Sequence, residues 1–165
     1  MMRTFLSTAQ FPGMKNRKQE MSTSHFHKPS GLWYQVDDSW REWVQCEMPS
    51  WCSEYTHEYE LEVTVEVLKI DTERKFWAFE AEFKRDQVID WPAVAKRYAG
   101  IEINPYFTGL RMVSWYYVWD VASGCVWHED GIKSVREIPL KPFINPYEED
   151  EYESIDQATT KATIG

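Results

Sequence analysis

The chain has 165 residues, which fits one domain with a sizeable core. Its net charge of -9 disfavours nonspecific binding to duplex nucleic acid, and no stretch approaches the ~18 apolar residues of a membrane span. Three cysteines without a C-x-x-C pair are typical of free thiols in a reducing compartment, so we expect a cytoplasmic protein. The unusual property is an aromatic content of 16%, with 9 Trp, 9 Tyr and 8 Phe.

Residues 1–24 lack apolar periodicity and predict a flexible N-terminal arm. Within it, "KNRKQEM" places Lys15, Arg17 and Lys18 shortly before Met21, and purine-rich codons like those of a bacterial ribosome-binding site can encode this stretch. Two interpretations stay open: an ordinary polar arm, or an upstream start with translation beginning at Met21. Under either one, the first twenty residues are expected to be dispensable.

A globular domain is expected over residues 25–140. "GLWYQV" predicts a strand because aromatic and β-branched residues suit a pleated surface. "SWREWVQCEM" then places Trp40, Trp43 and Val44 at i, i+3 and i+4, which predicts a short amphipathic helix.

"YELEVTVEVLKI" alternates between apolar and polar residues. Leu61, Val63, Val65 and Val67 point one way, which predicts one half-buried strand over residues 59–70. Further expected core residues are Ile101, Ile103, Val113 and Val126. The following "RKFWAFEAEFK" fits a strand or a short helix, and its periodicity does not distinguish them.

"DWPAVAKRYAG" predicts a helix with Asp90 as its N-cap, Pro92 in the first turn and Gly100 at the C-cap. The helix leads into the strand "IEI". After it, "SWYYVWDVASGCVW" indicates two aromatic strands, the first at 115–119, joined by a turn. The second of these strands is followed by another turn and a last strand.

Residues 141–165 are punctuated by proline and then acidic, which predicts an extended strap followed by a disordered tail. The expected fold class is therefore α+β. We expect a single domain with a mainly antiparallel, twisted sheet and two or three short helices.

Candidate site residues gather around the aromatic stretches. Trp33, Tyr34, Trp115 and Tyr117 are predicted to line a slot for a flat ligand, with His27 and Asp120 as the candidate catalytic groups. Alternation along the first strand leads us to expect Trp33 in the core beside Leu61, and Tyr34 in the cleft beside His27 and Asp120.

A metal site is not expected. Cys125 and His128 have a spacing compatible with metal ligands, and Cys46, Cys52 and His57 are further donors. A C-x5-C pair is not a zinc knuckle, and cysteines in aromatic strands usually belong to the core.

Three stretches resemble a known family. "VAKRYAGIEI" with the later "GCVWHEDGIKSVREI" resembles the closing half of small ADP-ribosyltransferase-like domains, and "KPSGLWYQVDDSWREW" is similar to their step from an aromatic strand into a short helix under the nicotinamide pocket. The resemblance covers roughly residues 25–138 and implies a fold that binds NAD without a Gly-rich loop. Ala99 stands where the family has Asp, and Gln35 where a small hydroxyl residue is common. The closing hairpin has no Glu-x-Glu pair, so Asp120 is the nearest carboxylate.

Three functions stay open at this point. The first is a noncatalytic binding protein of phage or mobile-element type that engages a host protein through an aromatic, acidic surface. The second is an ADP-ribosyltransferase-like protein, active or degenerate, that binds NAD or another nucleotide in an aromatic cleft. The third is a structural or assembly component. The sequence does not decide whether the protein is an enzyme.

Overall fold

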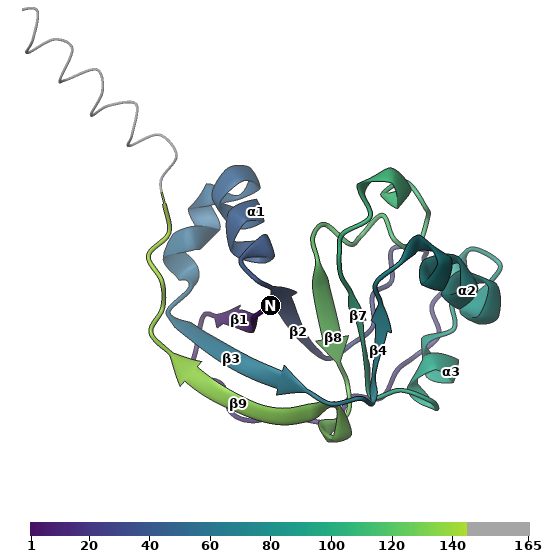
Figure 1. The fold of residues 1–165 in the computed structure, drawn as a ribbon, viewed down its shortest axis with the longest axis horizontal. Helices are drawn as coiled ribbons and strands as arrows, with labels where there is room; N and C mark the ends of the chain where they lie inside the picture. Colours follow the sequence, from purple (N-terminus) through teal and green to yellow (C-terminus); the bar gives the residue numbers. More distant parts are fainter. Residues whose placement is uncertain (145–165) are drawn as a thin grey trace, which may run out of the picture.

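Seven strands form one curled, mostly antiparallel sheet in a computed structural model that describes residues 1–144 (Figure 1). The strands are β1 (Arg3–Ser7), β2 (Leu32–Val36), β3 (His57–Val63), β4 (Val67–Ile70), β7 (Gly100–Ile103), β8 (Ser123–Val126) and β9 (Ile132–Ile138). Their order is β4-β7-β8-β2-β1-β3-β9, and β4 with β7 is the parallel pair. The chain is thus an α+β protein, as the sequence predicts.

The helices lie toward the two ends of the sheet (Figure 1). The α-helices are α1 (Ser39–Glu47), α2 (Glu73–Phe83) and α3 (Trp91–Ala95), and the 3₁₀ turns are η1 (Pro49–Glu54), η2 (Thr108–Leu110) and η3 (Glu129–Gly131). A small hairpin of β5 (Lys84–Arg85) and β6 (Val88–Ile89) joins α2 to α3. In Figure 1, α1 and η1 stand apart from α2 and α3, with the sheet below and between them.

The N-terminal strand corrects the predicted arm. β1 lies between β2 and β3, where Thr4 pairs with Gln35 on one side and with Glu60 on the other. Phe5 is buried in the core. The expectation of a flexible arm over 1–24 is therefore wrong for this strand, and the domain begins before residue 25. A five-residue strand held by two neighbours needs no strong pattern of its own, because pairing and packing come from elsewhere in the chain.

The alternating stretch 59–70 is two strands rather than one. β3 ends at Val63, a turn follows, and β4 begins at Val67, whose N–H donates to the carbonyl of Thr64. Val65 lies in this turn and is 94% exposed, so its predicted place in the core is wrong. Apolar and polar residues go on alternating through the residues of the turn. A period-2 pattern therefore cannot distinguish two strands joined by this turn from one continuous strand.

The helices follow their local signals. α1 forms as predicted, and its first N–H groups, those of Trp40 and Arg41, donate to the side-chain oxygen of Gln35 at 2.9 Å. The ambiguous stretch is the helix α2, which buries Phe76, Phe79 and Phe83 at helical spacing.

α3 also forms where the sequence predicts it. Asp90 caps it by accepting from the N–H of Ala93. Gly100 is the first residue of β7 and not a helix C-cap, so that expected role is wrong.

The predicted aromatic strand at 115–119 is absent. This stretch folds as consecutive turns, with the N–H of Tyr116 donating to Val113 and that of Trp119 to Tyr116. Trp115 and Trp119 are both buried at a spacing of four, which is helical rather than extended. Aromatic residues favour strands on average, but here burial of the rings against α2 and α3 decides the local structure.

The last described residues, 141–144, lie beside α1 and β3. The N–H of Lys141 donates to Glu58, the ring of Phe143 packs against the guanidinium of Arg41, and the N–H of Ile144 donates to Gln45. The predicted acidic tail lies outside the described residues.

Candidate functional site

A pocket of about 360 Å³ opens between α1 and the segment 119–121, above β1 and β2. Three tryptophans from different parts of the chain form much of its wall: Trp33 of β2, Trp40 of α1 and Trp119. Leu6 of β1 and Val121 add apolar surface. The pocket therefore depends on β1, the strand that the sequence pattern did not indicate.

The three indole rings of the pocket wall are fixed by contacts with other residues of the protein. Trp33 packs edge-on against Trp119 at a centroid distance of 5.0 Å and donates its ring N–H to the carbonyl of Pro29. Trp119 in turn stacks on Trp91 of the core. Trp40 stacks on Trp43 at 4.8 Å and donates its ring N–H to Tyr55. The walls are thus fixed by packing before any ligand enters.

Some polar groups of the pocket already have partners inside the protein. The Gln35 amide donates to Thr4 and accepts from the first turn of α1, and the hydroxyl of Ser123 donates to the carbonyl of Val121. These two side chains shape the pocket, and their hydrogen-bonding capacity is largely used.

Lys28 and Asp120 differ from Gln35 and Ser123 in their hydrogen bonding. Within residues 1–144 neither side chain has a hydrogen bond or an ion pair within 4.0 Å, and both line the pocket. The ammonium of Lys28 lies 5.0 Å from the centroid of the Trp33 ring. Burial lowers the pKa of Lys28, with Asp120 opposing the effect, and burial raises the pKa of Asp120, with Lys28 opposing it. The pocket therefore presents one positive and one negative group that are not paired with each other.

The ring N–H of Trp119 is also unpaired, but it lies inside the wall of the pocket. The residue is buried, and its ring N–H has no hydrogen-bond partner in the described part of the chain. An unpaired buried N–H costs free energy, and this one is enclosed by the protein and is not presented to a ligand in the pocket.

The structure brings part of the predicted site together. Trp33, Tyr34 and Asp120 line the pocket, but the two aromatic residues have exchanged their expected places. Tyr34 is buried in the cluster that contains Leu61, and its ring lies against Gly124. Trp33 is the half-buried residue whose ring faces Trp119. The expected inward Trp33 and cleft-facing Tyr34 are therefore wrong, because the side of the sheet that carries Leu61 is a second core and not the cleft.

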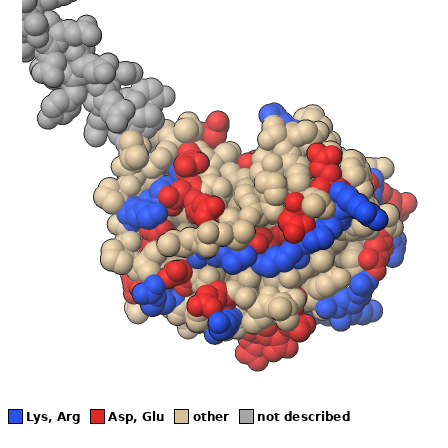
Figure 2. Space-filling model, viewed as in Figure 1, with Lys and Arg blue, Asp and Glu red and all other residues tan. Residues whose placement is uncertain are grey.

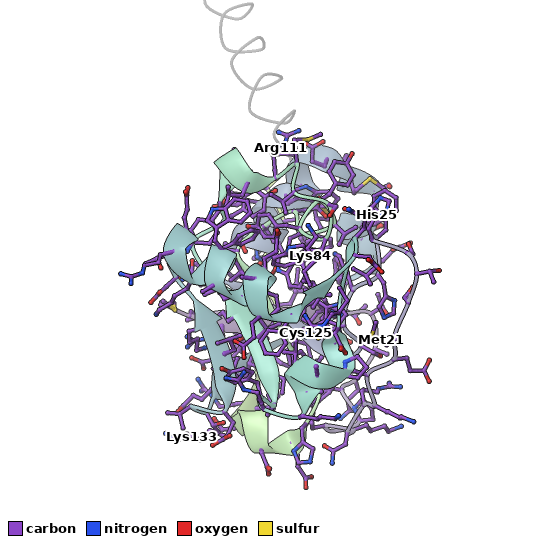
Figure 3. All side chains as sticks on the ribbon, turned by 90° about the vertical axis from the view of Figure 1, so that its right-hand side faces the viewer. Met21, His25, Lys84, Arg111, Cys125 and Lys133 are labelled. Carbon is purple, nitrogen blue, oxygen red and sulfur yellow. The ribbon has the colours of Figure 1, made fainter. Side chains whose placement is uncertain are left out.

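The other predicted residues lie elsewhere. Trp115 is buried against Phe76 and donates its ring N–H to Glu80. Tyr117 is exposed and its ring contacts that of Phe26. His27 does not line the pocket. Figure 3 places the neighbouring His25, like Met21, along the flank of the molecule, whereas Cys125 lies inside.

Lys28 and Trp40 are two of the pocket residues that sequence reasoning missed. Trp40 fits the apolar face of α1, so its helical spacing predicts core and gives no separate sign of a pocket. Lys28 stands between a histidine and a proline directly before β2, and a cation next to an aromatic strand is the signal that could have indicated it.

Beside the pocket, three tryptophans form a surface cluster, which we call the tryptophan patch: Trp40, Trp43 and Trp51. Trp51 of η1 is 36% exposed, and the other two are half-buried. Acidic and basic side chains are interleaved over the face in Figure 2, so the net charge of -9 does not make that face uniformly acidic.

A charged cluster lies at the centre of the sheet, on the side of Tyr34. Glu102 of β7 is 3% exposed and contacts Arg3, Lys69 and the hydroxyl of Tyr34. Burial raises the pKa of Glu102, but hydrogen bonds from Arg3 and Tyr34 and the positive charges of Lys69 and Arg3 together outweigh this and leave its pKa below the ordinary value. We interpret the cluster as structural, because Arg3, Lys69 and Tyr34 all contact the one Glu102 carboxylate, although Lys69 Nζ forms an ion pair there without a hydrogen bond.

Among residues 1–144 there is no group of three His, Cys, Asp or Glu side chains that could hold a metal ion, and no helix long and apolar enough to cross a membrane. Comparison of the chain with protein families, with curated proteins and with solved structures found no match. The resemblance to ADP-ribosyltransferase-like domains therefore stays a prediction.

Proposed function

We propose that this protein is a noncatalytic binding protein that holds a planar ring of a small ligand between the indoles of the pocket. The observation that carries the proposal is the convergence of Trp33, Trp40 and Trp119, from three segments far apart in the sequence, on one pocket. Indole faces stack on planar rings, and pockets with apolar walls and a few polar groups are typical of ligand sites.

The size of the pocket limits the ligand. A volume of about 360 Å³ is near the lower end of the ~300–1,000 Å³ that small-molecule sites span. It fits one ring system with its substituent. If NAD binds here, one of its two rings would occupy the pocket while the rest of the molecule lies outside.

Binding without catalysis fits the polar groups at hand. Asp120 is the one carboxylate of the pocket wall among the described residues, and His27, its predicted catalytic partner, lies outside that wall. The free cysteines Cys46, Cys52 and Cys125 support a cytoplasmic location, where thiols stay reduced.

The test is titration with N-phenyl-1-naphthylamine, an uncharged aromatic dye whose emission rises in apolar sites. We expect saturable binding, weakened by about 1–3 kcal/mol in Trp33→Ala and in Trp40→Ala because each removes one stacking face. Trp77→Ala is the matched control, since Trp77 lies on α2, is 45% exposed and is not part of the pocket.

Competition by NAD, adenosine and nicotinamide then tests the resemblance to ADP-ribosyltransferase-like domains. Melting curves of each variant establish that it is folded. Equal dye binding by the wild type, Trp33→Ala and Trp40→Ala, all folded, would contradict the proposal.

The tryptophan patch favours a second candidate function, binding of a protein partner, such as a host protein for a chain of phage or mobile-element type. Tryptophan is enriched at the energetic centres of protein interfaces, and these three side chains are adjacent and partly exposed. A pull-down from bacterial lysate should lose a specific band with Trp51→Ser and keep it with the control Trp77→Ser. An identical set of bands for both variants would contradict this function.

A further inference from the structure

The unused polar groups of the pocket restrict the chemistry of its ligand. Gln35 and Ser123 are bonded within the protein, whereas Lys28 and Asp120 have no partners among residues 1–144. A charged group that is drawn partly out of water costs free energy unless an opposite charge or hydrogen bonds accompany it. Lys28 is half-buried and Asp120 is exposed, and partial burial lowers the pKa of Lys28 and raises the pKa of Asp120.

Resting on the proposed function, we propose that the ligand is an aromatic zwitterion of the free amino-acid class, whose ring enters the tryptophan pocket, whose carboxylate binds Lys28 and whose ammonium binds Asp120. The pairing uses both charges of the pocket at once. Two opposite charges on one small ligand match two opposite charges on one small pocket.

Ligands with one charge match the pocket less well. An anion would pair with Lys28 but bring a like charge toward Asp120, and a cation would do the reverse. A neutral ring would displace water from both groups without replacing it. A zwitterion compensates for the lost hydration at both groups. The difference in affinity between these ligands therefore tests the inference directly.

The position of Lys28 also favours a ligand carboxylate. Its ammonium lies 5.0 Å from the centroid of the Trp33 ring, so the side chain is held at the pocket by a cation–π contact. A carboxylate that meets this ammonium stays close to the indole wall.

The experiment is calorimetric titration, at neutral pH, with four probes that share one ring. The probes are tryptophan (zwitterion), indole-3-propionate (anion), tryptamine (cation) and 3-methylindole (neutral). We expect tryptophan to bind about tenfold or more tightly than each of the other three, because a hydrogen bond to a charged group has that effect.

Two variants that each remove one charge separate the roles of the charges. Lys28→Gln should weaken tryptophan and indole-3-propionate about tenfold without weakening tryptamine. Asp120→Asn should weaken tryptophan and tryptamine to a similar degree without weakening indole-3-propionate. Trp77→Ala is again the control and should leave all four affinities unchanged.

The outcomes distinguish the two proposals. If 3-methylindole and the uncharged dye bind but tryptophan binds no tighter than 3-methylindole, ring binding stands and the zwitterion is wrong. The zwitterion is also wrong if both variants weaken all probes equally. If neither the dye nor any indole probe binds the folded protein, the proposed function fails and the inference fails with it.

Discussion

The hydroxyl of Tyr34 donates a 2.8 Å hydrogen bond to Glu102 between two strands that do not pair with each other, β2 and β7. The bond crosses over β8, where Gly124 has no side chain to obstruct it. Arg3 of β1 and Lys69 of β4 reach the same carboxylate, so Glu102 connects strands on both sides of the sheet centre. This relationship explains how a glutamate can be buried in the sheet.

Replacing Glu102 by glutamine should destabilise the protein. The change leaves Arg3 and Lys69 without a counter-charge, and breaking a buried ion pair in this way costs ~3–5 kcal/mol. Since Arg3 and Lys69 are partly exposed, we expect a smaller loss of about 2–4 kcal/mol in the free energy of unfolding, measured by urea denaturation. A loss below about 0.5 kcal/mol, the usual size of a surface effect, would show that the cluster is not structural.

The same carboxylate predicts a pH dependence. Its pKa in the folded protein lies below the ordinary value of 4.5, so the unfolded chain binds the proton more readily. The stabilisation is fully present above that ordinary value and is lost as pH falls through the lower, folded pKa. Urea denaturation at a series of acidic pH values should therefore show a shallower loss of stability in Glu102→Gln than in the wild type. Parallel curves would mean that other carboxyl groups account for the acid sensitivity.

Gly124→Ala should be destabilising because of the Tyr34 ring. A Cβ at position 124 would lie 2.3 Å from Cζ of Tyr34, a distance that packed atoms cannot hold. We expect a loss of about 1–3 kcal/mol, the usual cost of overpacking. Gly109→Ala is the matched control, since no atom lies within 4 Å of its Cβ position.

A double-mutant cycle checks the cause. If the ring is the obstacle, Gly124→Ala in a Tyr34→Leu background should cost clearly less than it does alone. Additive losses in urea denaturation would place the strain in the backbone instead.

The predictable part of the fold is the part with a local signal. β2, α1 and α3 each have a composition, a spacing or a capping residue that acts within a few residues, and each forms where expected. β1 has no such signal, because its stability comes from pairing with strands more than twenty residues away. The aromatic stretch at 115–119 has a strand-like composition, but its rings are buried by packing against distant helices.

The same distinction applies to the site. Trp33 and Asp120 are predictable, since an aromatic residue at a strand and an acid at a turn are visible in the sequence. Which face of β2 carries the pocket is not visible, because both faces are covered by apolar clusters. For that reason alternation correctly places Trp33 and Tyr34 on opposite faces of β2, but it assigns the pocket to the wrong one of these two faces.

Val65 and Val67 provide a direct test of the strand boundary. Val67 is 2% exposed in β4, whereas Val65 is 94% exposed in the preceding turn. Val67→Asp should prevent folding because it buries an unpaired charge, and Val65→Asp should change stability by no more than about 0.5 kcal/mol. Circular dichroism and thermal melting of both variants check this. Unfolding of Val65→Asp would mean that the alternating stretch is one continuous strand after all.

The N-terminal strand gives the strongest prediction. A chain that begins at Met21 lacks β1, so β2 and β3 lose the strand that pairs with both of them, and the core loses Phe5. The pocket also loses Leu6 from its floor. We expect this shortened chain to show no cooperative thermal transition, because unpaired backbone groups and exposed apolar surface would appear in the middle of the sheet rather than at its edge.

The control separates the loss of backbone pairing from the loss of one core side chain. Phe5→Ala in the full chain keeps the backbone pairing and should melt cooperatively, with a loss of about 3–5 kcal/mol for the large truncation. A chain from Met21 that melts at the wild-type temperature would show that residues 1–20, including β1, are not required for folding. That result would favour Met21 as the functional start, whereas failure to fold identifies residues 1–20, including β1, as part of the domain.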